Sequence, residues 1–307
     1  MKKVDLSVEI AGVKMKNPVM TASGTFAFGQ EYAELFPLGV LGAMVVKAVT
    51  PEARAGNPPP RLAETAAGLL NSIGLENPGV ETVLEKYLPP LQEAGAPVIV
   101  NIAGYTVEDY CLVAERLSTS PVVQALEVNI SCPNVKAGGM AFGSHPDTAA
   151  RVISAVKEHT SLPVIAKLSP NVTDIAGMAA AVEEAGADAV SLINALMGMA
   201  IDIRRRKPKL ANIVGGLSGP AVKPVALRMV WQVAQRVGIP VIGLGGIMNA
   251  EDALEFIMAG ATAVAVGTGQ FVNPRCCVEI IEGLQQYCEE NGVKKITDLV
   301  GIAWKEA

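Results

Sequence analysis

Short apolar segments recur along the whole chain and alternate with amphipathic ones. The apolar segments are continuous runs, without alternation of apolar and polar residues, which is typical of parallel strands buried on both faces. They predict eight strands, at residues 18–22, 43–49, 97–102, 125–131, 163–168, 189–194, 240–245 and 263–267. Helical periodicity predicts helices between most of them, at 80–92, 107–117, 147–159, 174–185, 221–237, 250–259 and 274–290.

Several of these helices have recognisable ends. Pro146-Asp147, Thr173-Asp174 and Asn249 are typical of helix starts, and two segments, 183–190 and 259–264, each show a helix end, a glycine turn and a new strand. Eight strand–helix units in 307 residues predict a (β/α)₈ barrel of the α/β class, a single domain over residues 1–307. Inserted βα loops account for the length beyond the ~250 residues of a typical barrel. An open, doubly wound sheet is the alternative, but no Gly-x-Gly-x-x-Gly motif follows the first strand.

Charge and cysteine usage exclude several classes of protein. The net charge of −5 argues against nucleic-acid binding, and the basic run at 204–207 is short. No apolar run reaches the ~18 residues of a membrane span, and acidic residues interrupt the start of the chain, so we expect neither a membrane segment nor a signal peptide. The five cysteines form no Cys-x-x-Cys pair, so we expect no metal site, no disulfide framework and a cytoplasmic location.

Polar residues stand where the predicted strands end. In such barrels the carboxyl ends of the strands and the loops after them carry the chemistry. Polar groups at the ends of apolar strands are costly unless they meet a polar partner, so their convergence predicts a ligand site. The residues are two lysines, three asparagines and a cysteine: Lys47, Lys167, Asn101, Asn129, Asn194 and Cys132.

The last two strands end in glycines, Gly245-Gly246 and Gly267-Thr268. Backbone N–H groups at these two strand ends are the usual phosphate site of a barrel. The segment 215–220, Gly-Gly-Leu-Ser-Gly-Pro, precedes the helix that leads to the seventh strand and offers a further backbone contact on the same side.

Cys132 stands in the segment Asn-Ile-Ser-Cys-Pro-Asn, residues 129–134. A free cysteine often only fills a core. A thiol at a strand end can instead act as a base when neighbouring cations lower its pKa from about 8.5. The loop that follows, 135–143, contains three glycines and is either a mobile lid over the cysteine or a plain surface loop.

Six motifs together resemble the dihydroorotate dehydrogenase family over essentially the whole chain. They are NSIGLENPG (71–79), NISCPN (129–134), AKLSPN (166–171), GGLSGPAVKP (215–224), GLGGI (243–247) and AVGTG (265–269). The resemblance is to the soluble class 1, and the first and fourth motifs are most similar to its NAD-linked branch, class 1B. In the membrane-associated class 2 a serine replaces the cysteine and a hydrophobic N-terminal extension is present.

The resemblance implies an FMN-dependent oxidation of dihydroorotate to orotate in pyrimidine (UMP) biosynthesis, with Cys132 as the catalytic base. The implied FMN contacts are Ser23, Lys47, Ala48, Asn101, Asn129, Lys167, Ile193, Gly219, Gly245, Gly246, Gly267 and Thr268. The implied substrate contacts are Lys47, Asn71, Ser72, Ile73, Gly74, Leu75, Asn129, Asn134, Asn194 and Ala195. The family usually has Thr or Ser at the position of Ala195, so a hydroxyl near the substrate is missing here.

The resemblance also implies a partner. The chain has no nicotinamide-binding fingerprint and no cysteine spacing for an iron–sulfur cluster. A class 1B chain would form a homodimer core within a heterotetramer and pass electrons to NAD⁺ through a subunit with FAD and a [2Fe-2S] cluster. Two alternatives remain open: a fumarate-linked class 1A homodimer, and a Schiff-base aldolase that uses Lys47 or Lys167.

Overall fold

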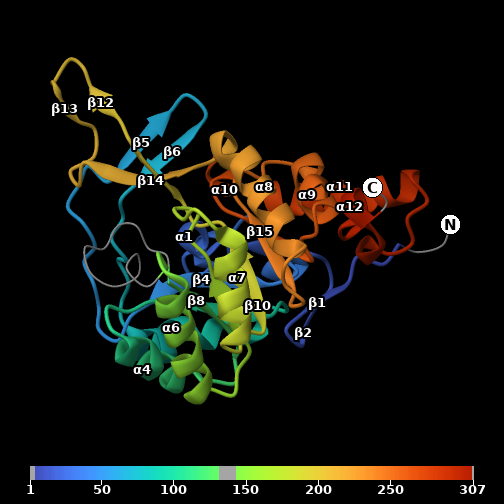
Figure 1. The fold of residues 1–307 in the computed structure, drawn as a ribbon, viewed down its shortest axis with the longest axis horizontal. Coiled ribbons are helices and arrows are strands. Elements are labelled where there is room, and N and C mark those ends of the chain that lie inside the picture. The colour runs from blue at the N-terminus through green and yellow to red at the C-terminus, as the bar shows by residue number, and fades with distance from the viewer. Residues whose placement is uncertain (1–3, 131–142, 306–307) are drawn as a thin grey trace.

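The computed structural model describes residues 4–130 and 143–305. Eight parallel strands form its central sheet, in the spatial order β3-β16-β15-β10-β9-β8-β7-β4 (Figure 1). Their bounds are β3 Val19–Thr21, β4 Met44–Val49, β7 Val98–Ile102, β8 Val123–Asn129, β9 Val164–Lys167, β10 Ala189–Leu192, β15 Val241–Leu244 and β16 Ala263–Val266. Each strand overlaps one of the eight predicted segments, so the strand prediction is confirmed.

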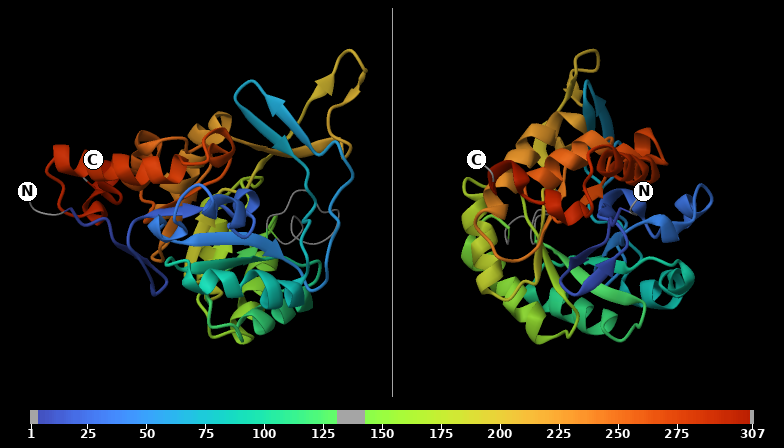
Figure 2. Two further views of the ribbon diagram at one scale, coloured as in Figure 1. Left: turned by 180° about the vertical axis from the view of Figure 1, so that it is seen from behind. Right: turned by 90° about the vertical axis from the view of Figure 1, so that its right-hand side faces the viewer.

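The sheet closes on itself between its first and last strands, β3 and β4. Met20 and Ala43 form a parallel bridge, and Val45 N donates a hydrogen bond to Thr21 Oγ1 at 2.9 Å. Helices surround the strands in the right-hand view of Figure 2. The predicted (β/α)₈ barrel is therefore confirmed.

The larger outer helices also follow the predicted pattern. They are α4 Val107–Leu117, α6 Pro146–Glu158, α7 Ile175–Glu184, α8 Lys223–Ala234, α9 Ala250–Met258 and α11 Cys276–Glu290. Two of the predicted starts are capped by side chains: Asp174 accepts from Gly177 N at 2.8 Å and Asn249 accepts from Asp252 N at 2.9 Å.

The predicted helix at 80–92 is wrong as a single element. It divides into α3 Val80–Thr82, a π-helical turn at Val83–Tyr87 and a 3₁₀ turn at Pro89–Glu93. Pro89 and Pro90 carry no N–H, so the regular α-helical hydrogen bonds cannot continue through them.

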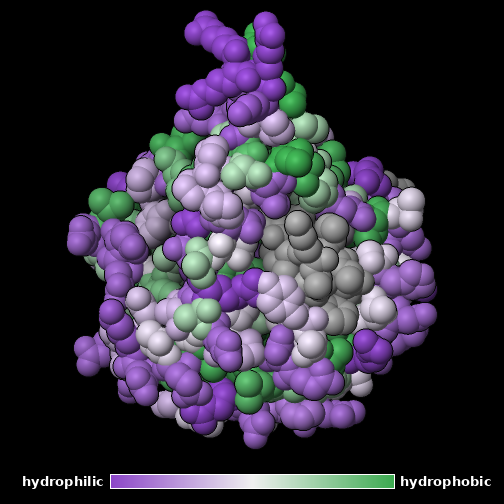
Figure 3. Space-filling view, turned by 90° about the vertical axis from the view of Figure 1, so that its left-hand side faces the viewer, coloured by the Kyte–Doolittle hydropathy of each residue, from purple (hydrophilic) through white to green (hydrophobic). Residues whose placement is uncertain are grey.

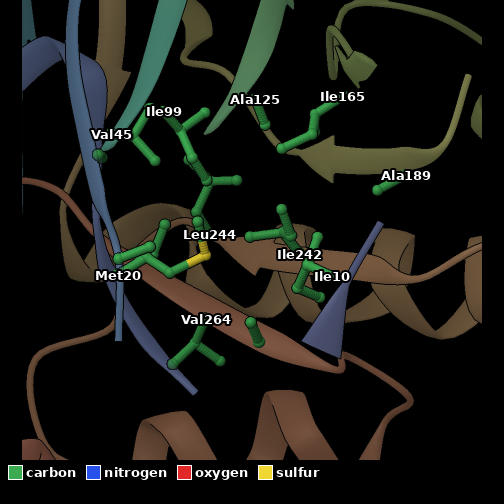
Figure 4. Close-up of a cluster of buried hydrophobic side chains, with 14 of the residues drawn as sticks. Ile10, Met20, Val45, Ile99, Ala125, Ile165, Ala189, Ile242, Leu244 and Val264 are labelled. Carbon is green, nitrogen blue, oxygen red and sulfur yellow. The ribbon is translucent and has the colours of Figure 1, made fainter. Parts of the chain in front are cut away.

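The barrel interior is apolar at its amino-terminal half. Figure 4 shows side chains such as Ile99, Ala125, Ile165 and Ile242 meeting in this core. Ile10, from the hairpin β1 Val8–Ile10 and β2 Val13–Met15, joins the same cluster and is fully buried. The core is therefore packed with side chains below the level at which the strands end.

Two insertions form a second, antiparallel sheet with the order β11-β14-β6-β5. The first insertion follows β4 and contains β5 Leu62–Thr65 and β6 Gly68–Asn71. The second follows β10 and contains β11 Leu196–Met199, β12 Ile201–Asp202, β13 Lys207–Pro208 and β14 Val214–Ser218. Leu70 pairs with Leu217, so the two insertions join through β6 and β14. The hairpin β12–β13 projects beyond them at the upper left of Figure 1.

Within the described ranges 4–130 and 143–305, no helix is both long enough and apolar enough to cross a membrane.

Candidate active site

One cavity lies at the carboxyl ends of the barrel strands, between the barrel and the inserted sheet. The predicted site residues that line it are Ser23, Lys47, Ala48, Asn71, Ile73, Gly74, Leu75, Asn129, Lys167, Ile193, Asn194, Ala195, Gly245, Gly246, Gly267 and Thr268. These residues come from distant parts of the sequence, and the closure of the barrel brings them together. Figure 3 shows the face of the molecule at the carboxyl ends of the barrel strands, with the hairpin β12–β13 at the top.

Three predicted residues that the structure describes do not line the cavity. Ser72 and Asn101 are fully buried beside the cavity without lining it, and Gly219 lies between the lining residues Ser218 and Val222. Cys132 and Asn134 lie outside the described residues, as does most of the predicted lid at 135–143.

The two lysines have different surroundings. Lys167 ends β9, and its buried ammonium group contacts Ser23 Oγ at 3.3 Å and a carboxylate oxygen of Glu127 at 3.1 Å. Lys47 is half-buried on β4. Burial is the main cause that lowers the pKa of Lys47; Glu76 opposes this effect and Arg61 adds to it. Both lysines therefore place an amino group at the wall of the cavity. That of Lys167 is paired with Glu127, and that of Lys47 has its pKa lowered mainly by burial.

Asparagine amides occupy the wall between the two sheets. Asn71 Nδ2 donates to the Gly216 carbonyl at 3.3 Å, and Asn194 Nδ2 donates to Asn129 Oδ1 at 3.4 Å. The Asn129 backbone carbonyl accepts from Tyr110 Oη at 2.9 Å. An amide side chain carries donors and an acceptor together, so this wall can bind a ligand that has both kinds of group.

Backbone geometry shapes the opposite wall. Gly245 and Gly246 have φ angles of +129° and +80°, in the region that favours glycine. A Cβ on Gly246 would come within 2.8 Å of Lys223 Cβ and 2.9 Å of the Gly219 carbonyl oxygen. None of the hydrogen bonds found between described residues uses the N–H groups of Gly246 or Thr268. These amides at the cavity wall suit an anion such as a phosphate.

Sequence reasoning missed two parts of the site. One is the apolar cover that the inserted sheet provides through Leu62, Leu69 and Leu217. The other is Glu127, a buried carboxylate inside the barrel. Glu127 stands two residues before Asn129 and thus on the same face of β8, which is a signal that the sequence does contain.

A barrel mouth with amide donors and acceptors, two lysines and a backbone anion site can bind a cofactor phosphate on one side and a small polar ring on the other. The model of the dihydroorotate dehydrogenase family matches residues 5–288. The chain therefore belongs to the dihydroorotate dehydrogenase family.

Curated relatives specify the branch. The chain is 61% identical over 301 residues, 98% of this chain and 99% of the relative, to the dihydroorotate dehydrogenase B (NAD(+)) catalytic subunit of Desulforamulus reducens. Proteins of the same name from Desulforudis audaxviator and Geobacillus kaustophilus are 59% and 56% identical. Each of these alignments covers 98% of this chain, and they cover 98% and 96% of the two relatives. The family resemblance of the motifs, with its class 1B branch, is confirmed.

Proposed function

We propose that this chain is the catalytic subunit of an NAD-linked dihydroorotate dehydrogenase, which oxidises dihydroorotate to orotate in pyrimidine biosynthesis. The observation that carries the proposal is the near full-length similarity to subunits of that name, 61% for one of them. The whole chain, residues 1–307, acts as one domain, since the barrel and the inserted sheet line the same cavity.

The residues of the cavity fit FMN as the cofactor. The amides of Gly246 and Thr268 and the glycines on either side of them offer a backbone cradle for its phosphate. Lys167 offers a cation at the cavity wall, and Asn101, buried beside the cavity, has an Oδ1 atom with no hydrogen-bond partner among the described residues. When bound, the flavin supplies the hydride acceptor for the reaction.

The substrate side of the cavity lies under the inserted sheet. Orotate and dihydroorotate present amide-like edges, which the side chains of Asn71, Asn129 and Asn194 can satisfy. Lys47 supplies a positive charge for the substrate carboxylate, and its desolvation strengthens the attraction. These residues orient the ring and exclude water from it.

Cys132 is the proposed base that removes the proton from the substrate. It lies outside the described residues, and the proposal is supported by its place three residues after Asn129, which lines the cavity. The described cysteines do not compete for this role. Cys111, Cys276, Cys277 and Cys288 are buried, and burial raises the pKa of each of these thiols, that of Cys276 to about 11.

Electrons leave through a partner subunit that holds FAD and a [2Fe-2S] cluster, in a heterotetramer around a homodimer of this chain. Exposed apolar residues support such contacts. Phe271 at the cavity rim and Val272 beside it are 55% and 70% exposed. A cytoplasmic location is part of the proposal and is supported by the four described cysteines, none of which forms a disulfide.

Ala195 offers a direct test of the substrate side. Ala195 lines the cavity, and its Cβ lies against Gly216, which has no side chain of its own. Ala195→Thr, which restores the hydroxyl usual in the family, is expected to lower KM for dihydroorotate by up to ~10-fold and to change kcat less. Steady-state kinetics with dihydroorotate and a dye acceptor measure both constants.

Ala195→Val is the matched control, because valine has the shape of threonine without the hydroxyl. It should leave KM unchanged or raise it. An equal response of KM to threonine and valine would show that shape, and not a hydrogen bond, decides the effect.

The proposed function itself is tested by anaerobic addition of dihydroorotate to the purified protein. Orotate should form while the absorption of the oxidised flavin is lost.

A further inference from the structure

Glu127 is a charged residue inside the barrel, and the reaction proposed above does not use it. Its side chain is 5% exposed. It follows Ala125 by two residues on β8 and pairs in register with Ile165 of β9, and Figure 4 shows both of these side chains in the barrel core. Residues two apart on a strand point to the same face, so Glu127 points inward, one layer above that core.

Both carboxylate oxygens of Glu127 have partners. Oε2 accepts from Asn101 Nδ2 at 2.6 Å and lies 3.1 Å from Lys167 Nζ, and Oε1 accepts from Ser191 Oγ at 2.8 Å. A carboxylate buried in this way is expensive unless it is paired and hydrogen-bonded. The four residues come from four adjacent strands, β7 to β10, and form one polar layer.

The layer meets the cavity through Lys167. Lys167 lines the cavity, whereas Glu127, Asn101 and Ser191 are absent from its described lining. Glu127 does not line the cavity itself, so it acts on a bound ligand through Lys167, with which it is paired. It holds the ammonium group in place and offsets its charge.

We propose that Glu127 is a positioning residue that limits how strongly Lys167 favours negative charge on the bound flavin. This inference rests on the proposed function for the presence of the flavin. With Glu127 ionised, the charges of Glu127 and Lys167 cancel, and the bound flavin experiences little net charge from the pair. With that charge removed, the lysine is uncompensated in a desolvated position, and any state of the flavin that gains negative charge becomes more favourable.

Sulfite binding measures how strongly the site favours negative charge on the flavin, and it needs no oxidation of substrate. The sulfur lone pair of sulfite forms a bond to the oxidised flavin ring, and the product is a colourless adduct with added negative charge. Glu127→Gln keeps the shape of the side chain and removes its charge. In the flavin-loaded protein, this variant is expected to bind sulfite at least ~10-fold more tightly than the parent, as expected when a charge loses its nearby opposite charge.

Ser191→Ala is the matched control, because it removes one hydrogen bond from the same carboxylate and leaves its charge. Its Kd for sulfite should stay within ~3-fold of the parent value, as for loss of one neutral hydrogen bond. The double variant Glu127→Gln/Lys167→Met should lose the gain of the single variant. Unchanged or weaker sulfite binding by a flavin-loaded Glu127→Gln protein would overturn the inference.

A flavin-free measurement separates this inference from the proposed function. In the apoprotein, Glu127→Gln should lower the Tm by several degrees, because it leaves a buried lysine unpaired. Addition of Lys167→Met should recover part of that loss. If the losses of Tm in the two single variants simply add in the double variant, the charge pairing is wrong, whether or not the parent protein binds flavin. Failure of the parent protein to bind flavin would instead contradict the proposed function.

Discussion

Replacement of Cys132 by alanine is expected to reduce kcat for dihydroorotate oxidation by at least ~100-fold, as is usual for the loss of a general base. The flavin should remain bound, because Cys132 is not among the residues proposed to hold it. Cys132→Ser should keep a trace of activity that increases with pH, since a hydroxyl has a much higher pKa than a thiol. Turnover with a dye acceptor, measured from neutral to alkaline pH, tests both variants.

Cys111→Ala is the control for loss of a thiol. Cys111 is buried in α4, and burial raises its pKa, so it has no part in the proposed chemistry. Its removal should leave kcat close to the parent value. Near-normal turnover by Cys132→Ala at neutral pH would remove Cys132 from the mechanism.

The second large effect concerns the electron acceptor. The purified chain is expected to pass electrons from dihydroorotate to dyes and to form no NADH above the blank. Co-expression with the electron-transfer subunit should confer NAD⁺ reduction and yield a stable mixed complex. The reason is that the proposed NAD⁺ site belongs to the partner subunit, since the sequence of this chain has no nicotinamide-binding fingerprint.

A surface variant locates the contact that this transfer needs. Val272→Glu, at the exposed apolar rim of the cavity, should weaken NAD⁺ reduction by the mixed complex and leave dye reduction by the chain intact. Ile203→Glu on the distant hairpin is the matched control and should affect NAD⁺ reduction less. Rapid NADH formation by the chain alone would contradict the partner model, and efficient fumarate reduction by the chain alone would favour the class 1A alternative.

The strands and the strand-end residues of the site could be predicted because their signals are local. Continuous apolar runs mark strands buried on both faces, and the residue at the end of each run is read directly from the sequence. Lys47, Lys167 and Asn129 were found in this way, and the structure places all three on one cavity.

The inserted sheet could not be predicted from local pattern. Its central pair joins Leu70 to Leu217, and short strands that pair across such a separation carry no periodic signal of their own. The helix expected at 80–92 failed for a different reason. Its apolar spacing continues across Pro89 and Pro90, although the backbone hydrogen bonds cannot.

Glu127 was not predicted as a site residue, because it lies within a strand and not at its end. It lies within the apolar segment that became β8, two residues before the polar end residue Asn129. Its importance becomes visible only when Lys167 and Ser191, from the next two strands, are placed beside it. A single charged residue inside a buried strand is thus a signal to seek its partner on neighbouring strands.

This chain is proposed to oxidise dihydroorotate with a flavin bound at the barrel mouth. The most direct measurement mixes the purified protein with dihydroorotate in the absence of oxygen and follows the flavin spectrum together with the orotate formed. The oxidised flavin band is expected to disappear, and one orotate should form for each flavin reduced. A protein that binds no flavin, or one whose flavin stays oxidised in excess dihydroorotate, would contradict it.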